Sequence, residues 1–200
     1  MSKIKVGILA LQGAFAEHAR AVESLGAVPV LLREASDVEG IDALILPGGE
    51  STVQGKLLRQ LNMEAPIKKE ILAGLPVLAT CAGVILLADH IENDRERYLG
   101  TLPVSVRRNA YGRQLASFMT AAPVEGFGRF DMTFIRAPQI TKVSDQVNVL
   151  ARVDGHISAV SYKNQVGLTF HPELGSDLRF HGQLLERAGR RKDGQLRKAI

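Results

Sequence analysis

Cys81 is the only cysteine in the chain, and its position is typical of a catalytic nucleophile. It separates an apolar run, 75–80, that predicts a buried strand from a segment, 82–88, whose apolar residues continue at helical spacing. Cysteine attacks as the thiolate, and the free N–H groups and dipole of a helix's first turn stabilise that anion. The same N–H groups can hold an oxyanion on a substrate. On Cys81 alone, a buried and inert cysteine is the alternative interpretation.

A base and an acid follow much later, at His171-Pro172-Glu173. Residues 166–170 predict a strand that ends at His171, and Pro172 favours an extended backbone there. Side chains two residues apart on an extended chain project to the same side, so Glu173 can orient the His171 ring. Taken one at a time, the alternative interpretation of His171 is an ordinary histidine at a strand end, and that of Glu173 is an acid near the start of a helix. Together with Cys81 they predict a Cys-His-Glu triad.

The first half of the sequence alternates predicted strands with predicted helices. The strands are apolar on both faces, which is typical of a parallel sheet with helices on both sides. The predicted strands are 4–11, 28–32, 42–46 and 75–80, and the predicted helices are 14–25, 51–62, 65–73 and 82–90. Gln12-Gly13, 47–51 and Cys81 each follow a strand. We therefore expect them to meet at the carboxyl edge of the sheet.

The second half predicts short strands with mixed or largely antiparallel pairing. Asp154-Gly155 supports a tight hairpin turn within it. The predicted strands lie near 101–107, 115–121, 131–135, 147–153, 157–162 and 165–170, and a helix over 177–188 follows. The chain shows no internal repeat and no linker, so we expect residues 1–200 to form a single domain.

The charge of the chain is unevenly distributed. The net charge is +4, but residues 179–200 hold seven basic and two acidic side chains, so the rest of the chain sums to −1. We expect a basic, frayed segment from about residue 189 rather than a nucleic-acid-binding face. One cysteine excludes an intrachain disulfide and favours a reducing, cytoplasmic location. The longest apolar run, 75–88, is too short to span a bilayer, and no residues have metal-site spacing, so we expect no membrane contact, no metal and no cofactor.

Several blocks of the sequence resemble those of class I, triad-type glutamine amidotransferases. Thr-Cys-Ala-Gly at 80–83 and His-Pro-Glu at 171–173 are typical of the whole class. Three further blocks resemble a narrower family, the glutaminase subunits of pyridoxal 5′-phosphate synthase: Gly-Gly-Glu-Ser at 48–51, Arg-Asn-Ala-Tyr-Gly-Arg-Gln at 108–114 and Ile-Arg-Ala-Pro at 135–138. The resemblance implies an α/β fold, a three-layer sandwich around a central mixed, mostly parallel sheet of the flavodoxin-like type.

The resemblance also implies a role for each matching residue. Cys81 would attack the side-chain amide of glutamine, and His171 would carry the thiol proton to the leaving ammonia. Glu173 would orient His171. The backbone N–H groups of Gly49 and Ala82 would form the oxyanion hole. Gln12 matches a residue linked to ordering that hole when a partner docks.

Glutamine itself would be held by a further set of residues. The positions that match the family's binding residues are Gly49, Glu50, Ser51, Arg108, Ile135 and Arg136. Chemically, Arg108 or Arg136 suits the substrate carboxylate through paired hydrogen bonds, and Glu50 suits the ammonium group. The alternative for these charged side chains is ordinary surface charge.

The implied partner is a (β/α)₈-barrel synthase subunit, which in this family receives the ammonia within a hetero-oligomeric complex. Two other interpretations stay open from the residues themselves. A cysteine hydrolase of related fold, such as a γ-glutamyl hydrolase or a peptidase, would use Cys81 and His171 but gives no reason for Arg108 and Arg136. A non-catalytic regulatory module would be favoured by a missing triad residue, and none is missing.

Overall fold

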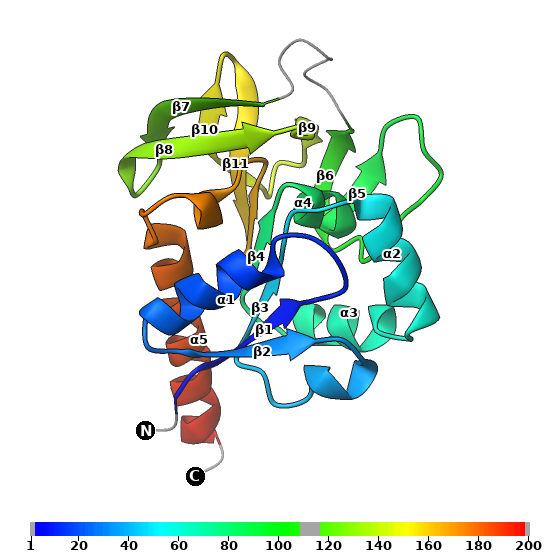
Figure 1. Ribbon diagram of the computed structural model, residues 1–200, viewed down its shortest axis with the longest axis vertical. Coiled ribbons are helices and arrows are strands. Elements are labelled where there is room, and N and C mark those ends of the chain that lie inside the picture. Colours follow the sequence, from blue (N-terminus) through cyan, green and yellow to red (C-terminus); the bar gives the residue numbers. More distant parts are fainter. Residues whose placement is uncertain (1–2, 109–116, 199–200) are drawn as a thin grey trace.

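A ten-stranded mixed sheet forms the centre of the molecule (Figure 1). The computed structural model describes residues 3–108 and 117–198, so 109–114 of the Arg-Asn-Ala-Tyr-Gly-Arg-Gln block lie outside the described residues. The first half supplies the elements β1 Lys5–Leu9, α1 Phe15–Ser24, β2 Val28–Leu32, the 3₁₀ turn η1 Ala35–Val38, β3 Ala43–Leu46, α2 Ser51–Gln60, α3 Glu64–Leu72, β4 Val77–Thr80, α4 Ala82–Leu87 and β5 Ala88–Ile91.

The second half supplies most of the antiparallel pairing. Its elements are β6 Leu102–Arg107, β7 Ser117–Val124, β8 Gly128–Ile135, β9 Gln139–Val143, β10 Asn148–Val153, β11 His156–Tyr162, β12 Gln165–Leu168, the 3₁₀ turn η2 Pro172–Leu174 and α5 Arg179–Lys198. Strands pair in the order β2-β1-β3-β4-β12-β11-β9-β6-β5, with β10 beside β11, while β7 and β8 form a separate hairpin. In this order, the neighbouring strands from β2 to β12 pair in parallel. The pairs β12–β11, β11–β9 and β9–β6 are antiparallel.

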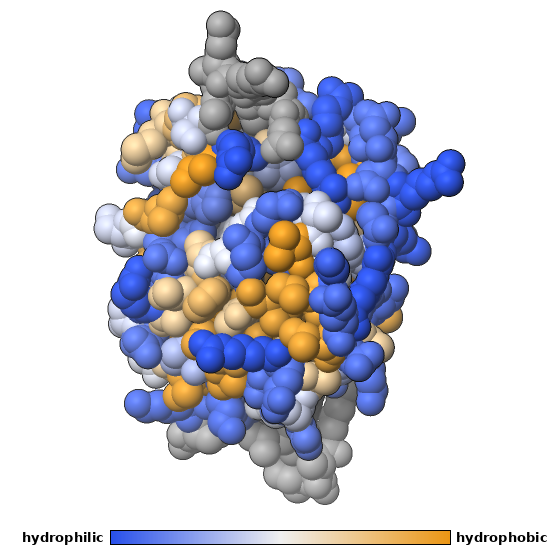
Figure 2. All heavy atoms as spheres, turned by 45° about the vertical axis from the view of Figure 1, so that its right-hand side comes forward, coloured by the Kyte–Doolittle hydropathy of each residue, from blue (hydrophilic) through white to orange (hydrophobic). Residues whose placement is uncertain are grey.

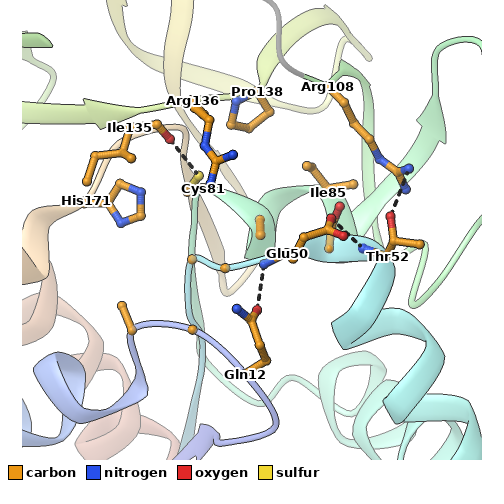
Figure 3. Close-up of a pocket in the computed structure, with 16 residues that line it drawn as sticks. Gln12, Glu50, Thr52, Cys81, Ile85, Arg108, Ile135, Arg136, Pro138 and His171 are labelled. Atoms are coloured by element: carbon orange, nitrogen blue, oxygen red, sulfur yellow. Dashed lines mark hydrogen bonds between the residues drawn. The ribbon is translucent and has the colours of Figure 1, made fainter. Parts of the chain in front are cut away.

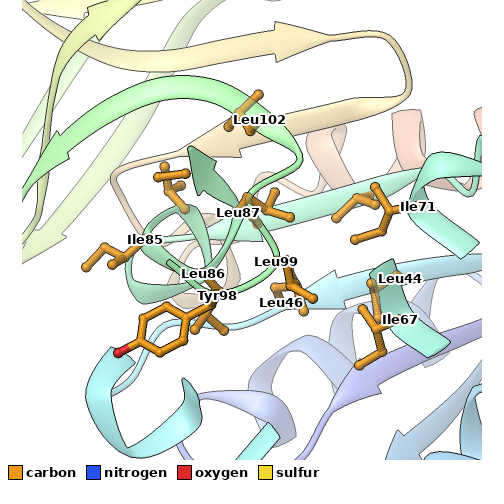
Figure 4. Close-up of a cluster of buried hydrophobic side chains, with 14 of the residues drawn as sticks. Leu44, Leu46, Ile67, Ile71, Ile85, Leu86, Leu87, Tyr98, Leu99 and Leu102 are labelled. Carbon is orange, nitrogen blue, oxygen red and sulfur yellow. The ribbon is translucent and has the colours of Figure 1, made fainter. Parts of the chain in front are cut away.

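Alternate residues of the central strands enter two separate cores. Leu44 and Leu46 of β3 pack against α2, α3 and α4, in the cluster drawn in Figure 4. Ala43 and Ile45 of the same strand face the opposite core, which includes Phe180 of α5 and the β7–β8 hairpin. This alternation is the expected consequence of the two-residue period of a strand. The sheet therefore lies between two apolar layers, as predicted.

The predicted hairpin turn is confirmed. Val153 pairs with His156, and the two residues between them have positive φ, +48° at Asp154 and +79° at Gly155. Positive φ at both central residues defines the tight turn that matches strand twist. The first four strands also lie where the sequence predicts them, each within a few residues of its expected ends.

Three sequence predictions are corrected. The helix predicted over 82–90 ends at Leu87, and Ala88–Ile91 is β5, which pairs with β6 at the sheet edge. β9 was not predicted, because three of its five residues are polar and hide the strand pattern. The last helix, predicted over 177–188, runs to Lys198. Ion pairs of Arg191 with Glu70 (3.6 Å) and of Lys192 with Asp42 (2.9 Å) hold this part of α5 against the body.

Among residues 3–108 and 117–198, no helix combines the length and the apolar character that crossing a membrane requires.

Candidate active site

Cys81 lies at a sharp turn between β4 and α4. Its backbone has φ +47° and ψ −106°, a conformation that non-glycine residues rarely adopt and that costs free energy. The Cys81 N–H donates to the Leu168 carbonyl at 2.8 Å, and the Cys81 carbonyl accepts from the Val84 N–H at 3.1 Å. α4 also approaches β3 so closely that a side chain at Gly83 would collide with the Leu46 carbonyl. The predicted strand–turn–helix around the thiol is thus present.

The structure brings the other two triad candidates to this thiol. His171 Nδ1 lies 2.7 Å from Glu173 Oε1, and the His171 ring and the Cys81 side chain both adjoin Gly48. The Cys81 thiol itself lies 3.8 Å from the Ile135 carbonyl oxygen, the contact drawn in Figure 3. The backbone between His171 and Glu173 is a 3₁₀ turn rather than the extended chain that the sequence predicts. The contact between their side chains nevertheless forms. Glu173 is fully buried behind the ring, with a side chain 0% exposed.

Protonated His171 is stabilised by its neighbours. Burial lowers the pKa of the ring, but the hydrogen bonds to Cys81 and Glu173 and the charges of both outweigh it and raise the pKa of His171 to about 10. At neutral pH the ring is therefore an imidazolium beside the sulfur.

The loop after β3 passes directly over the triad. Any side chain at Gly48 would collide with the His171 ring, so only glycine fits this position. The Gly48 N–H donates to Thr80 Oγ1 at 3.0 Å. Next to it, Gln12 Oε1 accepts a hydrogen bond from the Glu50 N–H at 2.7 Å. The loops after β1, β3 and β4 therefore meet at one edge of the sheet, as predicted.

These loops line a cavity of about 710 Å³ (Figure 3). In Figure 3, Ile135, Arg136 and Pro138 lie on one side of Cys81, and Gln12 lies on the other. Every residue predicted from the sequence except Glu173 lines the cavity: Gln12, Gly49, Glu50, Ser51, Cys81, Ala82, Arg108, Ile135, Arg136 and His171. Thr52, Ile85 and Pro138 line it too and were not predicted as site residues. Thr52 directly follows the Gly-Gly-Glu-Ser block and Pro138 is the last residue of the Ile-Arg-Ala-Pro block, whereas no signal marks Ile85.

The two arginines of the cavity differ in how they are held. Arg108 forms an ion pair with Asp94 at 2.8 Å and a hydrogen bond to the Tyr98 hydroxyl at 3.3 Å. Its Nε is buried and has no hydrogen-bond partner among the described residues. Arg136 has an unusual positive φ of +42° at the end of β8. Asp94 and Tyr98 carry no sequence signal, because they come from a loop outside every motif.

The acidic residue beside them serves the local fold. Glu50 is exposed, and its carboxylate accepts the Thr52 N–H at 3.2 Å as the cap of α2. The prediction that it meets a substrate ammonium group stays untested. No group of three or more His, Cys, Asp or Glu side chains within the described part of the chain is arranged to hold a metal ion.

Comparison with known proteins gives concordant results. Residues 8–189 match the profile of the SNO glutamine amidotransferase family. The chain is 55% identical over 184 residues to the pyridoxal 5′-phosphate synthase subunit PdxT of Desulfitobacterium hafniense, with 92% of each chain covered. It is 52% identical over 187 residues to the protein of the same name from Streptococcus pneumoniae, covering 92% of this chain and 96% of that one. A crystal structure described as a glutamine amidotransferase superposes with a TM-score of 0.88 at 44% identity, over 92% of this chain and 98% of that chain. This likeness confirms the predicted fold.

Proposed function

Because the chain belongs to the SNO glutamine amidotransferase family, we propose that it hydrolyses L-glutamine to L-glutamate and ammonia as the glutaminase subunit of a pyridoxal 5′-phosphate synthase. One observation carries the proposal. The carboxylate of Glu173 bonds to the ring of His171, and that ring adjoins the side chain of Cys81 across Gly48, at a cavity lined by the family-specific blocks.

The proposed reaction proceeds through a thioester. The Cys81 thiolate attacks the side-chain amide carbon of glutamine, and the N–H groups of Gly49 and Ala82 hold the resulting oxyanion. Protonated His171 gives its proton to the departing nitrogen, so the C–N bond breaks and ammonia leaves. His171 then takes a proton from water, whose oxygen attacks the thioester. Glutamate departs and the thiolate is restored, while Glu173 keeps the ring oriented throughout.

Arg108 is the better candidate of the two arginines for the substrate carboxylate. Asp94 and Tyr98 fix its guanidinium in place, and the side chain lines the cavity. A guanidinium held in advance loses little side-chain entropy when it binds a carboxylate. Arg136, Ser51 and Ile135 would complete the binding site from the other loops.

Replacing Arg108 by glutamine should raise the KM for glutamine by about 10- to 100-fold, because hydrogen bonds to a charged group contribute about 1.5–3 kcal/mol. Steady-state kinetics of the variant in the presence of the partner measure this. Arg107→Gln is the matched control, since Arg107 pairs with Glu92 at 2.8 Å and does not line the cavity. A KM of the Arg108 variant equal to that of the control would contradict the assignment.

We further propose that a (β/α)₈-barrel synthase subunit receives the ammonia, with this chain acting as a single cytoplasmic domain of a hetero-oligomer. Transfer within a complex suits ammonia, because in neutral water it is mostly the non-nucleophilic ammonium ion. Figure 2 shows apolar side chains gathered on one face with hydrophilic ones around them, which is typical of a surface that a partner covers. Val53 and Ile135, 42% and 38% exposed, are large apolar residues beside the cavity.

The proposal is tested by measuring glutamate release from L-glutamine with and without the barrel synthase. We expect glutamate in the presence of the synthase, and a lower rate without it. Release of glutamate from γ-glutamyl peptides but not from glutamine would favour the related-fold hydrolase instead. Turnover of neither substrate, with the complex assembled, would favour a regulatory module.

A further inference from the structure

Two buried histidines lie behind the triad, on the side away from the cavity. His18 comes from α1 and His181 from α5, and they are 0% and 1% exposed. His18 Nδ1 lies 2.9 Å from His181 Nε2. On its other side, His18 Nε2 lies 3.1 Å from Thr80 Oγ1 and 3.4 Å from Glu173 Oε2. The mechanism described above uses neither histidine.

The buried carboxylate decides where the hydrogen of His18 lies. Glu173 Oε1 accepts from His171, whereas Oε2 has no hydrogen-bond partner among the described residues, and His18 Nε2 lies 3.4 Å from it. A buried carboxylate oxygen without a donor is costly. Burial, followed by the charges of His181 and His171, lowers the pKa of His18, so its ring is neutral and carries a single hydrogen. A hydrogen on Nε2 donates to Thr80 Oγ1 and attracts the Glu173 carboxylate, whose Oε2 lies 3.4 Å from Nε2, whereas a lone pair there would repel that carboxylate.

The contact with His181 favours the same tautomer. If His18 carries its hydrogen on Nε2, its Nδ1 accepts from His181 Nε2–H, and the His181 Nδ1 atom is a bare lone pair. In the opposite arrangement His181 would carry its hydrogen on Nδ1, which is buried and has no partner among the described residues. Because unpaired buried N–H groups are rarer than unpaired acceptors, the first arrangement is preferred.

We propose that His18 is a positioning residue of the triad: its Nε2–H donates to Thr80 Oγ1 and attracts the adjacent Glu173 Oε2, which fixes the carboxylate that orients His171, while His181 holds the His18 ring in that tautomer. The inference rests on the proposed function for its kinetic readout. His18 also adjoins Thr80, whose hydroxyl oxygen accepts the N–H of Gly48. One neutral histidine therefore supports both the acid of the triad and the glycine loop above it.

Two amide substitutions separate this role from simple filling of the core. The amide nitrogen of glutamine reaches about the position of histidine Nε2, whereas that of asparagine reaches only the Nδ1 position. His18→Gln should therefore keep most of the kcat of the complex with the barrel synthase. His18→Asn should lower kcat by about 10- to 100-fold with little change in KM, as is usual when a residue that orients a functional group is removed.

The control is Val22→Ala, on the same buried face of α1, which removes apolar packing and no donor. It should lower the melting temperature and leave kcat at the wild-type value. Equal kcat values for His18→Gln and His18→Asn, measured where both are folded, would overturn the inference. So would a kcat for His18→Asn equal to that of Val22→Ala.

A second readout needs no substrate. Because Cys81 is the only cysteine, alkylation of the full chain by iodoacetamide at pH 7 reports on this thiol alone. His18→Asn should slow alkylation, since a poorly held Glu173 stabilises the imidazolium–thiolate pair less, and His18→Gln should restore the rate. Unchanged alkylation in His18→Asn would count against the positioning role. Absence of glutamine turnover in the wild-type complex would instead refute the proposed function, and alkylation would still test His18.

Discussion

Replacing Cys81 by alanine should reduce glutamine hydrolysis by the assembled complex at least about a thousandfold, because Cys81 is the only cysteine of the chain and no other side chain can form the thioester. The change removes one sulfur atom from a buried side chain and leaves the turn intact, since alanine meets the same backbone conformation as cysteine. Glutamate formation under saturating glutamine, followed over hours, gives the residual rate. Mass spectrometry of the wild-type protein during turnover should show the glutamyl adduct that the variant lacks.

Cys81→Ser is the companion variant. Serine has nearly the same shape, but its hydroxyl does not ionise beside an imidazolium as a thiol does, so it should be almost as inactive as alanine. Both variants should retain the wild-type melting temperature to within a few degrees and still bind the barrel synthase. Wild-type rates in either variant would eliminate the thioester mechanism and with it both enzymatic interpretations of the chain.

Replacing Gly48 by alanine should lower kcat by about a hundredfold while the protein still folds. The added methyl group would occupy the space of the His171 ring, so either the ring or the loop over it must move. Displacements of about 1 Å in a catalytic group cost roughly this much in rate. Steady-state kinetics and circular dichroism of the same preparation separate lost activity from lost structure.

Gly189→Ala is the matched control for Gly48→Ala. A methyl group at Gly189 meets no atom within 4 Å, and the residue lies within α5. Alanine there should raise stability by up to about 1 kcal/mol through its better helix propensity and leave kcat unchanged. If Gly48→Ala behaved like this control, the close approach of loop and ring would have no catalytic meaning.

The parallel half of the fold could be predicted from the sequence because its signals are local. Each central strand is a short apolar run, and each is followed by a helix with its own periodicity. The site blocks likewise follow strand ends, so topology alone places Gln12, Gly49 and Cys81 together. The residues Val28–Leu32, given by pattern alone, coincide with β2 as observed.

The elements that were missed depend on contacts between distant parts of the chain. β5 forms because it pairs with β6, whereas the sequence of its four residues alone predicts the end of a helix. α5 persists past Ala188 because Asp42 and Glu70 pair with it. The neighbours of Arg108 and the histidine pair behind Glu173 could not be predicted from the sequence either. A single buried histidine on a helix forms no sequence pattern. Their roles emerge only when three or four segments are brought together.

The placement of β12 has a consequence for assembly of the cavity. This strand follows β4 by more than eighty residues, yet it lies beside it in the middle of the sheet, where Leu168 pairs with Thr80 directly before Cys81. His171 and Glu173 come directly after β12. A polypeptide that stops before this strand therefore lacks a central strand of the sheet together with two of the three side chains grouped at the cavity.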